Sequence, residues 1–136
     1  MSLPAAALAL LGLVVRAANP VRLPPAQVRS GAPAAILLDL RLPQGWRLDP
    51  AAPVRWRFSE TWAGFAFVKR KGEERAPRNP LRIPFSAAPG ATGARLRVDY
   101  RRCRGSLCAD RSLDFLVVVS ASPEEPATEI PVRAHE

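Results

Sequence analysis

The sequence predicts an all-β protein, an immunoglobulin-like antiparallel β-sandwich of about eight strands. Three observations support this. Fifteen prolines and eight glycines are spread along 136 residues, which opposes long helices. Apolar and polar residues alternate with a period of two after residue 20, and no stretch sustains a helical period. We expect one such domain over residues 19–136, because this length allows a single modest core.

The alternation marks the strands in order along the chain. It is clearest, with apolar residues at every second position, at 36–42, 54–58, 81–85 and 96–100. Residues 115–119 are apolar throughout, which predicts a central strand covered on both faces. Weaker strands are expected at 21–28, 65–69 and 128–133, and charged loops at 69–75 and 122–126.

The N-terminal residues 1–18 have the outline of a secretory signal peptide. An apolar run ends at Val15, and Arg16-Ala17-Ala18 follows, with cleavage expected near Ala17 or Ala18. No basic residue precedes the run, so an uncleaved interfacial segment or a misplaced start are the alternatives. We expect the domain to be periplasmic or secreted, with no stable membrane span after cleavage, where paired cysteines stay oxidised.

The net charge of +8 comes from twenty basic residues against twelve acidic ones. The arginines stand singly at alternating strand positions, which is typical of a solvated sheet face. The alternative is a surface that binds polyanions, but such footprints concentrate charge beside exposed aromatic residues. We therefore expect no nucleic-acid partner.

Other chemistries find few candidates in the sequence. His135 is the only histidine, and we expect it to be inert in a frayed tail. The chain lacks four local ligands of the kind that zinc requires, so no metal and no cofactor are expected. The aromatic segment 62–67 has two interpretations: Phe65 and Phe67 are core residues of a strand, or the segment is a loop that caps the cysteines.

The two cysteines, Cys103 and Cys108, flank a short turn that contains Gly105. Gly105 can adopt the positive φ of a tight turn, which would bring the two cysteines to disulfide distance. The bridge is then either a staple or a pair that exchanges disulfides. The nearby arginines favour thiolate over thiol and so favour exchange; they are Arg101, Arg102, Arg104 and Arg111. Which cysteine attacks cannot be read from the sequence.

The segment from Tyr100 through Cys103 to Cys108, followed by a hydrophobic strand, resembles the N-terminal periplasmic domain of DsbD-type thiol:disulfide interchange proteins. Residues 42–53, with a proline-glycine and then an alanine-proline element, are similar to the β-domain that follows the NHL propeller in thioredoxin–NHL proteins. Together the two matches cover most of the chain after residue 30.

The resemblance implies a function for the cysteine pair. Cys103 and Cys108 would be catalytic in thiol–disulfide exchange, and Tyr100 would pack beneath them, with Arg102 and Arg104 as supporting residues. A thioredoxin-like protein or a membrane electron donor would be the partner. The alternative is a non-catalytic accessory or protein-binding sandwich in which the cysteine pair is a structural disulfide.

Overall fold

The computed structural model describes residues 20–67, 69–75 and 78–136. The secondary structure of these residues consists of strands joined by turns and loops, and no helix occurs among them. The predicted signal peptide lies outside these residues. The strands are β1 (Val21–Arg22), β2 (Ala26–Arg29), β3 (Ala34–Arg41), β4 (Arg47–Leu48), β5 (Val54–Ser59), β6 (Phe65–Ala66), β7 (Lys71–Glu74), β8 (Leu81–Ala87), β9 (Gly90–Arg104), β10 (Leu107–Ser122) and β11 (Glu129–His135).

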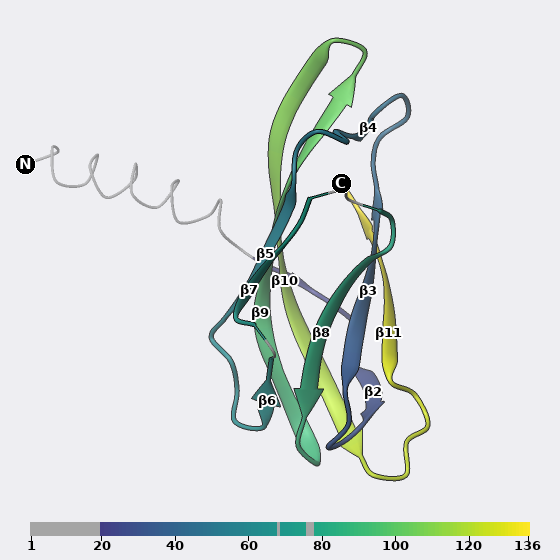
Figure 1. Cartoon of the computed structure of the whole chain (residues 1–136). Coiled ribbons are helices and arrows are strands. Elements are labelled where there is room, and N and C mark those ends of the chain that lie inside the picture. Colours follow the sequence, from purple (N-terminus) through teal and green to yellow (C-terminus); the bar gives the residue numbers. More distant parts are fainter. Residues whose placement is uncertain (1–19, 68, 76–77) are drawn as a thin grey trace, which may run out of the picture.

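Two sheets pack face to face (Figure 1). The larger sheet has the order β1-β10-β9-β5-β7, with β2 also paired to β10 and β4 to β9. The smaller sheet has the order β11-β3-β8-β6. The predicted all-β sandwich is confirmed.

Both sheets are mixed, although the alternation had suggested purely antiparallel pairing. β1 and β2 pair with β10 in parallel, and β11 pairs with β3 in parallel. These partners lie far apart in the sequence, so no hairpin dictates their direction. Period-two alternation reports which face is buried and is the same for either direction, which is why the sequence did not distinguish them.

The core lies between the sheets and is built from the alternating apolar positions. Ile36, Phe58, Ile83 and Leu96 are essentially inaccessible to solvent. Such side chains each stabilise the fold by roughly 1.5–3 kcal/mol through burial. The core face of each sheet is therefore the one that the sequence predicted.

The aromatic segment 62–67 contributes to the core and does not cap the cysteines. Phe65 is buried and stacks on Phe85, with ring centroids 5.1 Å apart, and Phe67 packs against Phe58 at 5.5 Å. β6, which begins at Phe65, lies at the end of the sandwich opposite the turn of the β9–β10 hairpin (Figure 1).

Two expectations about strands need correction. Residues 115–119 are buried on one face only, because Leu116 and Val118 on the outer face stay partly exposed. Lys71–Glu74 was expected in a loop but forms the edge strand β7 against β5. A Cβ at Gly72 would stand 2.2 Å from the Trp56 ring, so only glycine lets this strand approach β5 so closely.

The C-terminal strand is longer than predicted and ends in an ordered position. β11 continues to His135, which pairs with Arg41 of β3 and is exposed. The expectation of a frayed tail around His135 is wrong, because the parallel ladder with β3 satisfies the backbone of this segment.

The hairpin of β9 and β10 is the longest element and projects beyond the sandwich at the top of Figure 1. The two strands pair without interruption from Gly90 and Ala121 to Arg104 and Leu107. A two-residue turn joins them, in which Gly105 has a φ of 60°, as the sequence predicted. This projection carries both cysteines.

Candidate functional site

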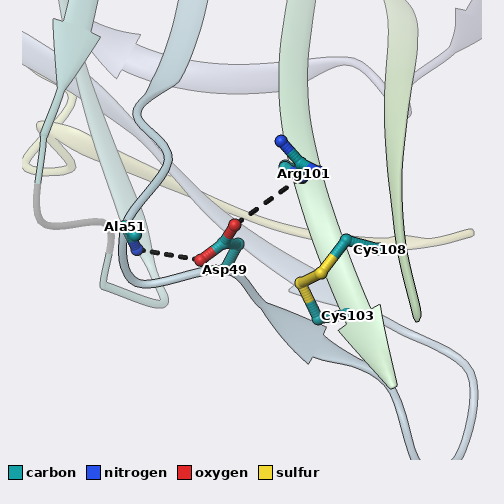
Figure 2. Close-up of a disulfide and its surroundings, with 5 residues drawn as sticks. All are labelled: Asp49, Ala51, Arg101, Cys103 and Cys108. Carbon is teal, nitrogen blue, oxygen red and sulfur yellow. Dashed lines mark hydrogen bonds and ion pairs between the residues drawn. A yellow bond between two sulfur atoms is a disulfide. The ribbon is translucent and has the colours of Figure 1, made fainter. Parts of the chain in front are cut away.

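Cys103 and Cys108 face each other directly across the hairpin and form a disulfide (Figure 2). The sulfur atoms are 2.09 Å apart and the Cα atoms 4.1 Å apart. The bond therefore runs across the two strands, from β9 to β10, close to the turn.

The disulfide lies on the outer face of the larger sheet. Cys103 shares this face with Arg101, as the alternation predicted, since residues two apart in a strand point to the same side. It is nonetheless only 7% exposed, because Arg47 of β4 pairs with it on the side away from β10. Cys108 is half-buried. The alternation that continues from Leu96 and Val98 predicts a solvent-exposed Cys103 beside the arginines, and this prediction is wrong: Cys108 is the more accessible cysteine.

Asp49 approaches the disulfide from the loop after β4 (Figure 2). One carboxylate oxygen lies within 4.8 Å of both sulfur atoms. The carboxylate is held in place: Oδ1 accepts a hydrogen bond from the Ala51 amide at 2.9 Å, and Oδ2 lies 3.7 Å from Arg101 Nε. The Asp49 amide also donates to the Arg101 carbonyl oxygen at 2.9 Å.

Sequence reasoning missed Asp49 as a site residue. Asp49 next to Pro50 is typical of a break between strands, and the contact of Asp49 with the hairpin is a tertiary one. The one indirect signal is the resemblance expected for residues 42–53, which include Asp49. The structure places these residues against the hairpin through β4, beside the disulfide.

Arg102 and Arg104 contact Trp46 and do not approach the disulfide in any contact that the structure shows. The Arg102 guanidinium carbon lies 3.9 Å from the centre of the Trp46 ring, and that of Arg104 lies 5.2 Å away. Arg102 is 6% exposed, and its Nε lies 2.7 Å from Glu136 Oε1. These arginines join the loop before β4 to the hairpin by cation–π contacts.

Tyr100 lies on the opposite face of the hairpin from the cysteines, beneath the sheet that carries them. Its hydroxyl donates a hydrogen bond of 2.5 Å to Glu136 Oε2, and Arg111 Nε lies 3.5 Å from Oε1 of the same carboxylate. Burial raises the pKa of Tyr100, and the hydrogen bond to the Glu136 carboxylate raises it further. Tyr100, Arg102 and Arg111 thus clamp Glu136 to the hairpin.

The charge around the disulfide is therefore mixed. Each of Arg101, Arg102 and Arg111 lies within 4 Å of a carboxylate, and Asp49 stands nearest to the sulfur atoms. The arginines are therefore not the only charges near the cysteines, because Asp49 and Glu136 carry the opposite charge.

A groove of about 580 Å³ lies along the larger sheet, and its lining includes Arg101 and Asp110, each two residues from a cysteine. Its charged lining alternates in sign, with Arg97 3.0 Å from Asp99 and Arg55 3.1 Å from Glu73 beside it. Burial alone would raise the pKa of Asp99, but hydrogen bonds from Ser112 and Arg97 outweigh it and lower the pKa. The interleaved carboxylates are what a solvated face would show.

One group of metal-ligating side chains occurs in the described ranges, and it consists of Asp49 and the two cysteines. The sulfur atoms are bonded to each other, whereas a metal requires thiolates. Three ligands also fall short of the four of a structural zinc site. The group is better explained by sulfur chemistry than by a metal.

No family model matches this chain, and a search of curated proteins finds no relative of it. Over the residues that the structure describes, no helix has the length and apolar character needed to cross a membrane.

Proposed function

We propose that the domain carries out thiol–disulfide exchange through Cys103 and Cys108. The observation that carries the proposal is the unequal exposure of the two cysteines in one disulfide. Cys103 is covered by β4, whereas Cys108 is half-buried in the stretch Leu107–Asp114 of β10, which pairs only with β9 among the described residues. Exchange requires one sulfur open to attack and a second held close enough to leave and return.

Exchange begins when a partner thiolate attacks the sulfur of Cys108. The bond between Cys103 and Cys108 breaks, its electron pair stays on Cys103 as a thiolate, and a mixed disulfide joins Cys108 to the partner. A second partner thiolate then attacks the partner's own sulfur and releases Cys108. Two electrons have moved to the domain, which ends as a dithiol, and the partner ends as a disulfide. The reverse sequence donates two electrons.

Asp49 contributes to the proton transfers in this proposal. A leaving Cys103 thiolate takes up one proton, and in the reverse direction an attacking thiol loses one. A carboxylate within 4.8 Å of both sulfur atoms can relay that proton through one water molecule. Its hydrogen bond to Ala51 and its contact with Arg101 keep it in that position.

We also propose that the chain is related to the N-terminal domain of DsbD-type proteins and to the NHL-linked β-domain. The sandwich fold agrees with such a relationship, as does the meeting of residues 42–53 with the cysteine hairpin. On this proposal the domain works in the periplasm or outside the cell, and a thioredoxin-like protein or a membrane electron donor is its partner.

A structural disulfide in a protein-binding module is the second candidate. It is favoured by the burial of Cys103 and by the projection of the hairpin, whose end has only β4 beside it among the described residues. A cross-strand bridge there would hold together two strands that the core does not reach. The two candidates differ in whether Cys108 reacts.

The test compares two variants, Cys103→Ser and Cys108→Ser, which leave one thiol each. We expect Cys108 in Cys103→Ser to react with Ellman's reagent about tenfold faster than Cys103 in Cys108→Ser, because the covered thiol is shielded. Each rate is measured beside that of the same variant unfolded in urea. Equal and slow rates for both folded variants would support the structural disulfide.

A further inference from the structure

The edge of β10 next to Cys108 is open. β9 pairs with one side of β10 along its whole length, but on the other side β1 begins to pair only at Phe115 and β2 only at Val119. Within the described ranges, no strand pairs with that side between Leu107 and Asp114. Such an edge is a template for another strand.

The backbone of Cys108 points toward this open edge. Leu116 and Ser122 accept hydrogen bonds from Leu23 and Ser30 on the β1–β2 side, so their carbonyl groups point away from β9. In an antiparallel pair, the direction of the backbone groups alternates from residue to residue. The pairing with β9 has no bulge, so the other even-numbered residues point the same way. These include Cys108, Asp110, Ser112 and Asp114.

A strand added at this edge would place one residue directly opposite Cys108, on the side away from Cys103. Paired Cα atoms that exchange hydrogen bonds stand about 5.5 Å apart, within the range of 4.4–6.8 Å that disulfides span. The side chain of that residue would lie on the outer face, as the disulfide does. A sulfur atom there would face Cys108 from the side opposite Cys103, in line with the bond that breaks.

We infer that the exchange partner binds by strand addition to the open edge of β10, with its cysteine opposite Cys108. The inference rests on the proposed exchange function and assigns to it a partner chemistry, an extended segment that contains a cysteine. Exchange then moves the disulfide from one neighbour of Cys108 to the other, while β10 stays in place. Cys103 leaves as a thiolate and takes up a proton from water, which the Asp49 carboxylate can relay.

The charge of Asp110 at this edge further restricts which residues the partner segment can carry. Asp110 lies on the same face as Cys108, two residues along the edge, and forms no ion pair with any described residue. Opposite charges on neighbouring strands stabilise a pair, and like charges oppose it. The partner segment therefore carries a lysine or arginine two positions from its cysteine.

The experiment uses the full oxidised chain and three thiol probes. One is a short blocked peptide of alternating valine and threonine, with a central cysteine and a lysine two positions from it. The second is the same peptide with N-methyl groups on the backbone beside the cysteine, which removes its strand donors. The third is 2-mercaptoethanol, which needs no docking. The rate of reduction of the disulfide is followed by mass spectrometry after acid quenching.

We expect the unmethylated peptide to reduce the disulfide about tenfold faster than its N-methylated copy, the effect of about one lost hydrogen bond. Asp110→Pro places a ring on the open edge, where proline is tolerated within a sheet. It should lower the ratio of the peptide rate to the mercaptoethanol rate about tenfold, and Asp110→Ala, the matched control, should lower it less.

Equal rates for the two peptides with the unaltered chain would overturn strand addition, whether or not Asp110→Pro folds. The proposed exchange function would still stand if both peptides reduced the Cys103–Cys108 disulfide faster than they reduce a linear reference disulfide. If no probe reduced the Cys103–Cys108 disulfide faster than it reduces the reference disulfide, the proposed exchange function would fail, and the inference would fail with it.

Discussion

The two halves of the β9–β10 hairpin are stabilised by different kinds of interaction. In the sandwich, most inward side chains of the hairpin are apolar and buried; Leu96, Val98, Phe115 and Val117 are at most 3% exposed. Beyond Tyr100, the same two strands carry arginines, acidic residues and the disulfide, and β4 is the only strand of the described ranges that pairs beside them (Figure 1). The first half is held by burial, and the second by a few specific links.

Those links are the disulfide, the Glu136 clamp and the contact of Trp46 with Arg102. None of them is a large apolar cluster, so the projecting half can change its bonding while the sandwich stays folded. The residues that hold the fold and the residues of the candidate site therefore lie in different halves of one continuous pair of strands. Each of the following predictions tests that separation.

The largest effect should come from the sandwich. Ile83→Ala removes a fully buried side chain and should lower the free energy of unfolding by about 2–5 kcal/mol. Leu107→Ala, at the exposed tip of the hairpin, should change it by less than about 0.5 kcal/mol. Urea unfolding followed by tryptophan fluorescence measures both, and similar losses for the two variants would contradict the separation.

The second effect concerns the disulfide. Replacing both cysteines by serine should lower the free energy of unfolding by about 2 kcal/mol, because the closed loop is short. The far-ultraviolet circular dichroism of the sandwich should be unchanged. Loss of that signal at room temperature would show that the disulfide holds the whole fold, not just the projecting half.

The third effect concerns the Glu136 clamp, the contacts of Tyr100, Arg102 and Arg111 with the Glu136 carboxylate. Tyr100 is the only tyrosine in the chain, so absorbance at 295 nm reports its ionisation alone. Its pKa is raised in the folded state, so the unfolded state loses the proton first and the free energy of unfolding falls as the pH rises above 10.0. Glu136→Gln removes the carboxylate charge and should move the titration to lower pH. An unchanged titration would contradict the clamp.

The smallest effect concerns the outer face. Asp99 has a lowered pKa, so it stabilises the folded state above its ordinary value of 3.8, and the contribution is lost as the pH falls below that value. Asp99→Asn should cost less than about 1 kcal/mol at pH 7, because the pair with Arg97 is exposed. At pH 2 the variant and the unaltered chain should unfold at nearly equal urea concentrations.

The sandwich could be predicted from the sequence because burial leaves a period-two pattern. Val54, Phe58, Leu81 and Leu96 are buried where the alternation placed them. The hairpin and the pairing of Cys103 with Cys108 followed from local spacing and from Gly105. These are short-range features, which a single sequence records well.

The surroundings of the disulfide could not be predicted in the same way. Trp46 and Asp49 come from the loops on either side of β4, more than fifty residues before Cys103, and Glu136 follows β11. Contacts of this kind depend on how the strands are ordered in the sheets, which alternation does not encode. The arginines were therefore assigned to the cysteines, although the structure pairs most of them with carboxylates.

On the proposed function, the Cys103–Cys108 disulfide exchanges in the projecting half of the hairpin. The most direct test is the redox potential of this disulfide, which is measured by trapping free thiols across graded glutathione and dithiothreitol buffers. We expect a value of roughly −120 to −270 mV, in the range of known exchange proteins. A value below about −300 mV would mark a structural disulfide and contradict the proposed function.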